Sequence, residues 1–176
     1  QVNITLGSLR TVNIFILGDA YQPGVYTISA LSTLTNAIFV SGGISPTGSL
    51  RNIELKRNGE VISTFDLYDL LLNGDNSKDL RLMAGDVIFI KPINKTVGLS
   101  GEVSRPGIYE LAADENLNDL IKYAGNLRAK ADINSIEVQR IDRELNSYTL
   151  SSFSLNNHQE AGFTLNNGDL ITVYPI

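Results

Sequence analysis

Few side chains of this 176-residue sequence could do chemistry, and they do not form a catalytic set. There is one histidine, His158, and no cysteine, so the sequence offers no thiolate nucleophile, no disulfide and no cluster of imidazole ligands for a metal. His158 stands in the polar stretch 155–160, where we expect a solvated loop residue. Cysteine chemistry and a histidine-based triad are therefore excluded.

Two pairs of aspartates are candidates for holding a cation. Asp66 lies three residues before Asp69, and Asp75 lies four residues before Asp79. Neither pair has the D-x-D-x-D-G spacing with which a calcium loop surrounds its ion with oxygen atoms. We therefore expect solvated carboxylates on helix and loop faces. The sequence predicts no metal site, no cofactor, no catalytic residue and no enzymatic activity.

An internal repeat organises the chain. Residues 12–93 align without a gap on residues 95–176, at a constant separation of 83 residues. The matched pairs include Gly18/Gly101, Pro23/Pro106, Gly24/Gly107, Tyr26/Tyr109, Leu34/Leu117, Gly42/Gly125, Ile53/Ile136, Arg57/Arg140, Phe65/Tyr148, Leu67/Leu150, Leu82/Leu165, Gly85/Gly168 and Asp86/Asp169. We predict a lead-in segment at residues 1–11 and two domains of one fold, at residues 12–93 and 94–176.

Each copy has the pattern of an α+β domain. In the first, apolar runs at 12–17 and 25–29 predict two strands, and the residues after them change to helical spacing. Thr33 and Asn116 are suitable N-caps for helices of about ten residues, which Gly42-Gly43 and Gly125 should end. A hairpin at Asn58-Gly59, a short helix over 66–72 and a strand over 87–91 follow. The predicted order is ββαββ, short helix, β, forming a mixed sheet of four or five strands with one main helix.

Arg57 and Arg140 are the most notable polar pair. By strand alternation Arg57 shares the inward parity of Ile53 and Leu55, so it should lie at the end of the core face. Two roles stay open for both arginines. Each could lay its stem along the core and pair with a nearby carboxylate or carbonyl, or it could contact an acidic ligand or a neighbouring subunit.

Two further repeated motifs are expected to form turns. Pro23-Gly24 and Pro106-Gly107 fit a type II turn, in which the proline presets φ and the glycine supplies a positive φ. Gly85-Asp86 and Gly168-Asp169 precede the last strand of each copy, and there the aspartate should bond the backbone two residues further on. These residues are predicted to be structural.

The net charge and the hydropathy of the sequence limit the classes of partner that we expect the chain to bind. Fourteen basic against 19 acidic residues leave a net charge of −5, which disfavours nucleic acid and other polyanions as partners. The longest unbroken apolar stretches, such as Ile14–Leu17, are four residues long, whereas a membrane-spanning helix needs about 20. We expect no direct membrane span.

The combined pattern resembles a known family. Both copies carry G-x-x-x-x-P-G-x-Y, then a helix ending in glycine, a strand ending in arginine, and a closing G-D-x-I-x-x-x-P. This resembles the soluble-ligand-binding β-grasp (SLBB) domain, which occurs in tandem in bacterial outer-membrane polysaccharide export proteins. Residues 7–11, Gly-Ser-Leu-Arg-Thr, are similar to the segment before such domains.

The resemblance implies two tandem ubiquitin-like β-grasp domains and a role in exporting capsular polysaccharide or exopolysaccharide. It implies a periplasmic position, associated with the outer membrane through other parts of a longer parent protein. It also implies homo-oligomerisation of that parent and contact with other export and synthesis machinery. A structural and interaction module without chemistry is the leading hypothesis, and binding of a soluble sugar or small ligand is the alternative.

Overall fold

A computed structural model describes residues 10–176, and these divide into two compact units that meet between Ile93 and Asn94. Most of the predicted lead-in segment at residues 1–11, including part of the Gly-Ser-Leu-Arg-Thr motif, lies outside the described residues. Within residues 10–176, no helix is long and apolar enough to cross a membrane.

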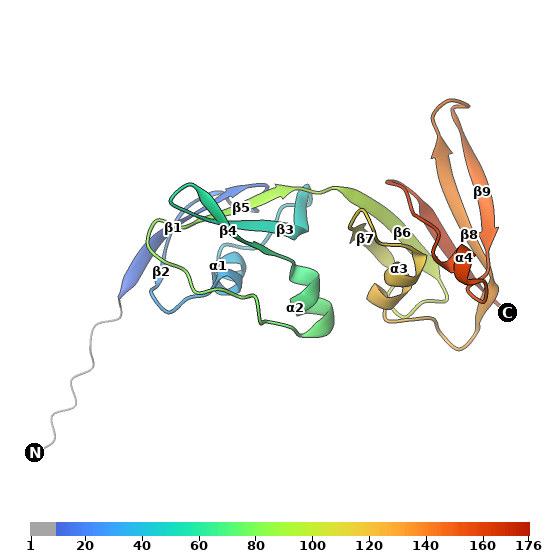
Figure 1. The fold of residues 1–176 in the computed structure, drawn as a ribbon, viewed down its shortest axis with the longest axis horizontal. Helices are drawn as coiled ribbons and strands as arrows, with labels where there is room; N and C mark the ends of the chain where they lie inside the picture. Colours follow the sequence, from blue (N-terminus) through green and yellow to red (C-terminus); the bar gives the residue numbers. More distant parts are fainter. Residues whose placement is uncertain (1–9) are drawn as a thin grey trace, which may run out of the picture. The chain divides into compact units, whose positions relative to one another are not determined.

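The first unit is a five-stranded mixed sheet with one main helix against it (Figure 1). The strands stand in the order β2-β1-β5-β3-β4, in which β1 and β5 are parallel and the other neighbours antiparallel. Its elements are β1 (Thr11–Gly18), β2 (Gly24–Ser29), α1 (Leu34–Val40), β3 (Gly48–Arg57), β4 (Glu60–Phe65), α2 (Leu67–Asn73) and β5 (Val87–Pro92).

The second unit repeats this architecture with the strand order β7-β6-β10-β8-β9. Its elements are β6 (Lys95–Gly101), β7 (Gly107–Leu111), α3 (Leu117–Tyr123), β8 (Ala131–Asp142), β9 (Ser147–Phe153), α4 (His158–Ala161) and β10 (Leu170–Pro175). The predicted α+β class, with a mixed sheet and one main helix in each of two tandem copies, is confirmed, and the element order is the predicted one.

Local sequence explains both main helices. Thr33 and Asn116 are the N-caps, and each forms a capping box with the side chain three residues on. Gly42 and Gly125 follow the C-caps with φ of 95° and 78°, the left-handed conformation that ends a helix. Both helices have seven residues, fewer than the ten expected.

The helices cover one face of each sheet, where the cores form. In the first unit Leu34 and Ile38 of α1 are buried against Ile16, Leu55 and Ile88 of the sheet. The second unit has its own cluster, with Leu117 and Leu120 of α3. The predicted apolar helix stripe is therefore the face that closes each core.

The hairpin after the main helix differs between the copies. Ile53 pairs with Phe65 in the first unit, but its counterpart Ile136 pairs with Phe153, so β8–β9 is five residues longer than β3–β4. The ungapped match of Phe65 to Tyr148 is wrong, and so is that of Leu67 to Leu150. Leu67 is 3% exposed and Leu150 is 64% exposed. The copies return to the 83-residue separation by Leu82 and Leu165, because the segment after the longer hairpin is five residues shorter.

The turns of the two hairpins show how the extension is accommodated. Asn58 and Gly59 both have positive φ, 53° and 81°, the geometry of the type I′ turn that the Asn-Gly pair predicts. In the second unit the strands continue to the pairing of Asp142 with Ser147, and Asn146 has a φ of 47°. The extended β8–β9 hairpin is visible in Figure 1.

Candidate functional site

Arg57 lies at the end of β3 and pairs with the buried carboxylate of Asp86. Its Nε donates to Oδ1 and its Nη2 to Oδ2, both at 2.8 Å. Asp86 is fully buried, whereas the Arg57 side chain is 29% exposed. The hydrogen bonds that Arg57 donates to Asp86 raise the pKa of Arg57 above its ordinary value against the opposing effect of burial. This bidentate pair ties the end of β3 to the start of β5.

Arg140 makes the same pair with Asp169 in the second unit. Nε lies 3.0 Å from Oδ1 and Nη2 lies 2.6 Å from Oδ2. Nη2 also donates to the carbonyl of Thr164 at 3.1 Å, and the guanidinium stacks over the Phe163 ring, 4.8 Å from its centroid. The hydrogen bonds that Arg140 donates to Asp169 raise the pKa of Arg140. The first of the two roles considered for these arginines is thus realised in both units, and contact with a ligand or subunit stays a prediction.

Each of these aspartates also closes a turn, though not in the expected manner. Asp86 Oδ2 accepts the backbone N–H of Met83 at 2.8 Å, and Asp169 Oδ2 accepts that of Asn166 at 2.7 Å. The bond runs three residues back, not two residues on. Gly85, which stands just before Asp86, has a φ of 83°. This turn therefore requires the positive φ that glycine adopts without strain.

The two Pro-Gly motifs differ from the predicted type II turn. Gly107 has no positive φ, so that expectation is wrong there, whereas Gly24 has a positive φ of 159°, which is close to extended backbone. Nothing lies within 4 Å of a Cβ built on either glycine. Each motif leads directly into a strand, β2 or β7, and the tyrosine of that strand forms a hydrogen bond with the residue before the proline. The hydroxyl of Tyr26 donates to the carbonyl of Gln22, and that of Tyr109 to the carbonyl of Arg105.

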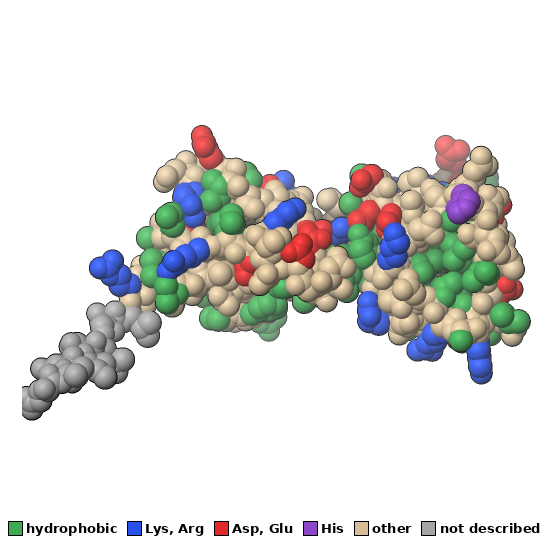
Figure 2. Space-filling view, turned by 60° about the horizontal axis from the view of Figure 1, so that its bottom comes forward, with side chains coloured by type: hydrophobic (Ala, Val, Ile, Leu, Met, Phe, Trp, Pro, Cys, Tyr) green, Lys and Arg blue, Asp and Glu red, His purple; other side chains and the backbone are tan. Residues whose placement is uncertain are grey.

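The remaining chemical candidates have structural partners or face solvent. Asp66 caps α2 and pairs with Arg51 at 3.0 Å, and both oxygens of Asp79 accept hydrogen bonds from Thr35. Within residues 10–176, no three histidine, cysteine or acidic side chains come close enough to hold a metal. His158 is exposed, purple in Figure 2, and begins the short helix α4, so the expected loop position is wrong.

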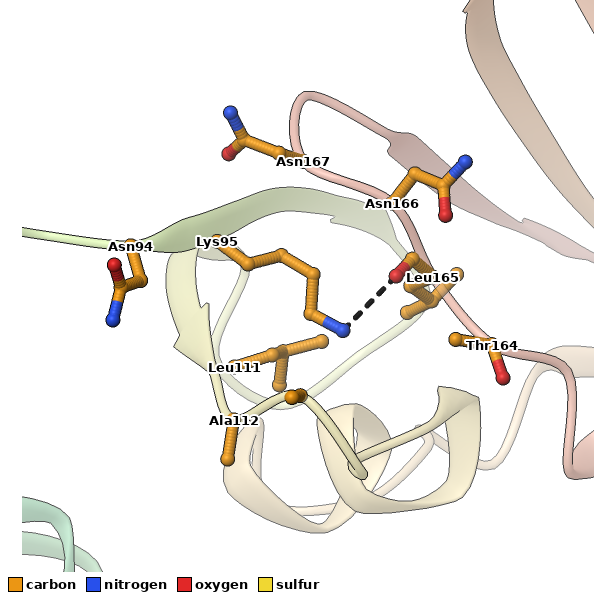
Figure 3. A pocket seen from close by; sticks show the side chains of 9 residues that line it. Asn94, Lys95, Leu111, Ala112, Thr164, Leu165, Asn166 and Asn167 are labelled. Carbon is orange, nitrogen blue, oxygen red and sulfur yellow. Dashed lines mark hydrogen bonds between the residues drawn. The ribbon is translucent and has the colours of Figure 1, made fainter.

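An open pocket of about 450 Å³ lies within the second unit. Figure 3 shows Lys95 crossing it from β6, with its ammonium group donating to the carbonyl of Leu165 at 3.0 Å. The other lining residues are Asn94, Leu111, Ala112, Ala113, Thr164, Asn166 and Asn167. A second pocket, of about 470 Å³, shares Asn166 and Asn167 and is lined by Arg140, Asp142, Arg143 and others.

Lys95, Thr164 and Asn166 are not among the residues predicted to form a site. The sequence does contain a signal for them, because the repeat pairs each with a residue of different chemistry in the first copy. These counterparts are Val12, Arg81 and Met83. Because the two copies share one fold, different residue types at matching positions give the copies different surface chemistry.

Known proteins match both copies. Residues 12–90 and residues 96–149 each match a family described as the SLBB domain. Two Escherichia coli proteins, both named polysialic acid transport protein KpsD, are 26% identical to this chain over 175 residues. These matches take in 98% of the chain but only 30% of each relative, so the chain spans less than a third of their length. Because the family matches include both copies and cover most of the chain, the chain belongs to the SLBB domain family.

Proposed function

We propose that this chain is a structural and interaction module of a capsular polysaccharide or exopolysaccharide export protein and contributes no chemistry of its own. The observation that carries the proposal is the similarity to KpsD, a polysialic acid transport protein, which runs through both copies and 98% of the chain. The module acts in the periplasm, joined to the outer membrane through other parts of a longer parent.

The contacts of the recurring polar residues support a structural role. Arg57 and Asp86 are paired within the first unit, and Arg140 and Asp169 within the second. The recurring tyrosines donate their hydroxyl protons to backbone carbonyls of their own units. What the two copies share is thus used to hold the fold. Surfaces outside these positions are free to differ and to meet partners.

The partners we propose are further copies of the parent protein and the other components of export and synthesis. Strands at the sheet edges provide unpaired backbone groups for such contacts, since within residues 10–176 β4 and β9 each have a neighbour on one side only. β9 has the larger exposed edge, because six of its seven residues are exposed.

Deletion of residues 12–176 from the parent protein tests the proposal. Polymer should disappear from the cell surface, while polymer made inside the cell remains, because the deleted part is needed for export and not for synthesis. Surface polymer is measured on intact cells and total polymer after lysis. Normal surface polymer in the deletion strain, or hydrolysis of polysaccharide by the purified chain, would contradict it.

A further inference from the structure

Lys95 is the one charged residue among those that line its pocket. None of its nine lining residues is acidic, and within residues 10–176 the Lys95 ammonium has no ion pair and one hydrogen-bond acceptor, the Leu165 carbonyl. An ammonium carries three donors, so two are left for a ligand. The neighbouring pocket, by contrast, includes the carboxylate of Asp142.

The polar lining suits a ligand with many hydroxyl groups. Asn94, Asn166 and Thr164 line the pocket, and their side-chain amide and hydroxyl groups can both donate and accept hydrogen bonds. The Asn167 amide oxygen accepts the backbone N–H of Thr96 at 2.9 Å, which leaves its NH₂ group as a donor. The lining residues Leu111, Ala112 and Ala113 are apolar. A volume of about 450 Å³ lies within the range of small-molecule sites.

The first copy lacks this arrangement and serves as an internal comparison. The isolated bridges Thr33–Arg81 and Asn116–Thr164 show that Arg81 is the structural counterpart of Thr164. Arg81 extends to the carbonyl of Ala30, with its Nε at 3.2 Å, and Ala113, the counterpart of Ala30, lines the pocket. The first copy thus places an arginine where the second has a short threonine. It also has Val12 in place of Lys95.

We propose that the Lys95 pocket binds a carboxylated sugar of one or two rings. The ammonium of Lys95 holds the carboxylate, and the amides and the Thr164 hydroxyl bind the sugar hydroxyls. Charge selects the acidic sugar over a neutral one, and the hydroxyl contacts select it over a simple anion. This site does not depend on the export role, because it rests on the geometry of the second unit alone.

Calorimetric titration of the purified chain with glucuronate, glucose and acetate tests the site. We expect glucuronate to bind more tightly than glucose or acetate. Its binding should weaken in 1 M salt, where the Debye length falls to about 3 Å. Lys95→Met removes the charge and keeps the stem, so glucuronate affinity should fall by about tenfold or more. Lys130→Met, the loss of an exposed lysine outside the pocket, is the matched control and should leave affinity unchanged.

Thr164→Arg gives the second copy the residue that stands at the matching position of the first copy, Arg81. The arginine should extend to the Ala113 carbonyl and abolish glucuronate binding, while the circular dichroism spectrum stays that of the wild type. No binding of glucuronate to the wild-type chain, or equal binding by Lys95→Met or Thr164→Arg, would overturn the site. Acetate binding as tight as that of glucuronate would overturn the assignment to a sugar.

Discussion

Gly101→Ala is expected to destabilise the second unit by more than about 3 kcal/mol, the upper end of the cost of one strained backbone position. Gly101 has a φ of 89° at the end of β6, a conformation that alanine adopts poorly. A Cβ there would also overlap the carbonyl oxygen of Val173 in β10. That oxygen accepts the N–H of Glu102 at 2.8 Å, so it cannot move away without breaking this hydrogen bond.

Urea denaturation of Gly101→Ala and Gly107→Ala provides the comparison. Gly107 is exposed, has no positive φ and has no atom within 4 Å of a built Cβ, so its replacement should change stability by less than about 0.5 kcal/mol. Equal midpoints for the second unit in both variants would show that the approach of β10 to Gly101 does not constrain this residue. Gly18 occupies the same place against Ile90 in the first unit, with a φ of 78°.

Arg140→Ala is expected to cost about 2–3 kcal/mol of unfolding free energy, below the full cost of breaking a buried pair because the arginine is partly exposed. The Asp169 carboxylate, 1% exposed, would keep only the N–H of Asn166 among its present partners. In a double-mutant cycle with Asp169→Ala, the coupling energy should be about 2 kcal/mol, as for a charged hydrogen-bonded pair.

Arg143→Ala is the matched control for this second prediction. Arg143 lies beyond the end of β8, is exposed, and its loss should change stability by less than about 0.5 kcal/mol. Both variants are measured by urea denaturation at the same pH and ionic strength. A cost for Arg140→Ala no greater than that for Arg143→Ala would contradict a stabilising role of the pair.

Local signals predicted much of the fold. The N-caps Thr33 and Asn116, the glycines after each main helix and the type I′ turn at Asn58-Gly59 all depend on residues close in sequence. The hairpin lengths could not be read from the repeat, because five extra residues in one segment are cancelled by five fewer in the next. Only strand pairing shows that Phe153, and not Tyr148, takes the place of Phe65.

The sites depend on contacts between distant residues. Strand parity placed Arg57 at the edge of the core, but its partner Asp86, 29 residues away, was expected only to form a local turn. Likewise, the need for glycine at Gly101 comes from the carbonyl of Val173 in another strand, which no local pattern encodes. Periodicity indicates the face on which a side chain lies, and the packing of the strands decides what it meets there.

Surface polymer on cells whose parent protein carries Gly101→Ala or Gly107→Ala is the most direct test of the export role. The folded second unit is needed for export in this account, so Gly101→Ala should remove polymer from the surface and leave polymer inside the cell. Gly107→Ala should leave both unchanged. Normal surface polymer with Gly101→Ala, in cells where the second unit is shown by proteolysis to be unfolded, would contradict the account.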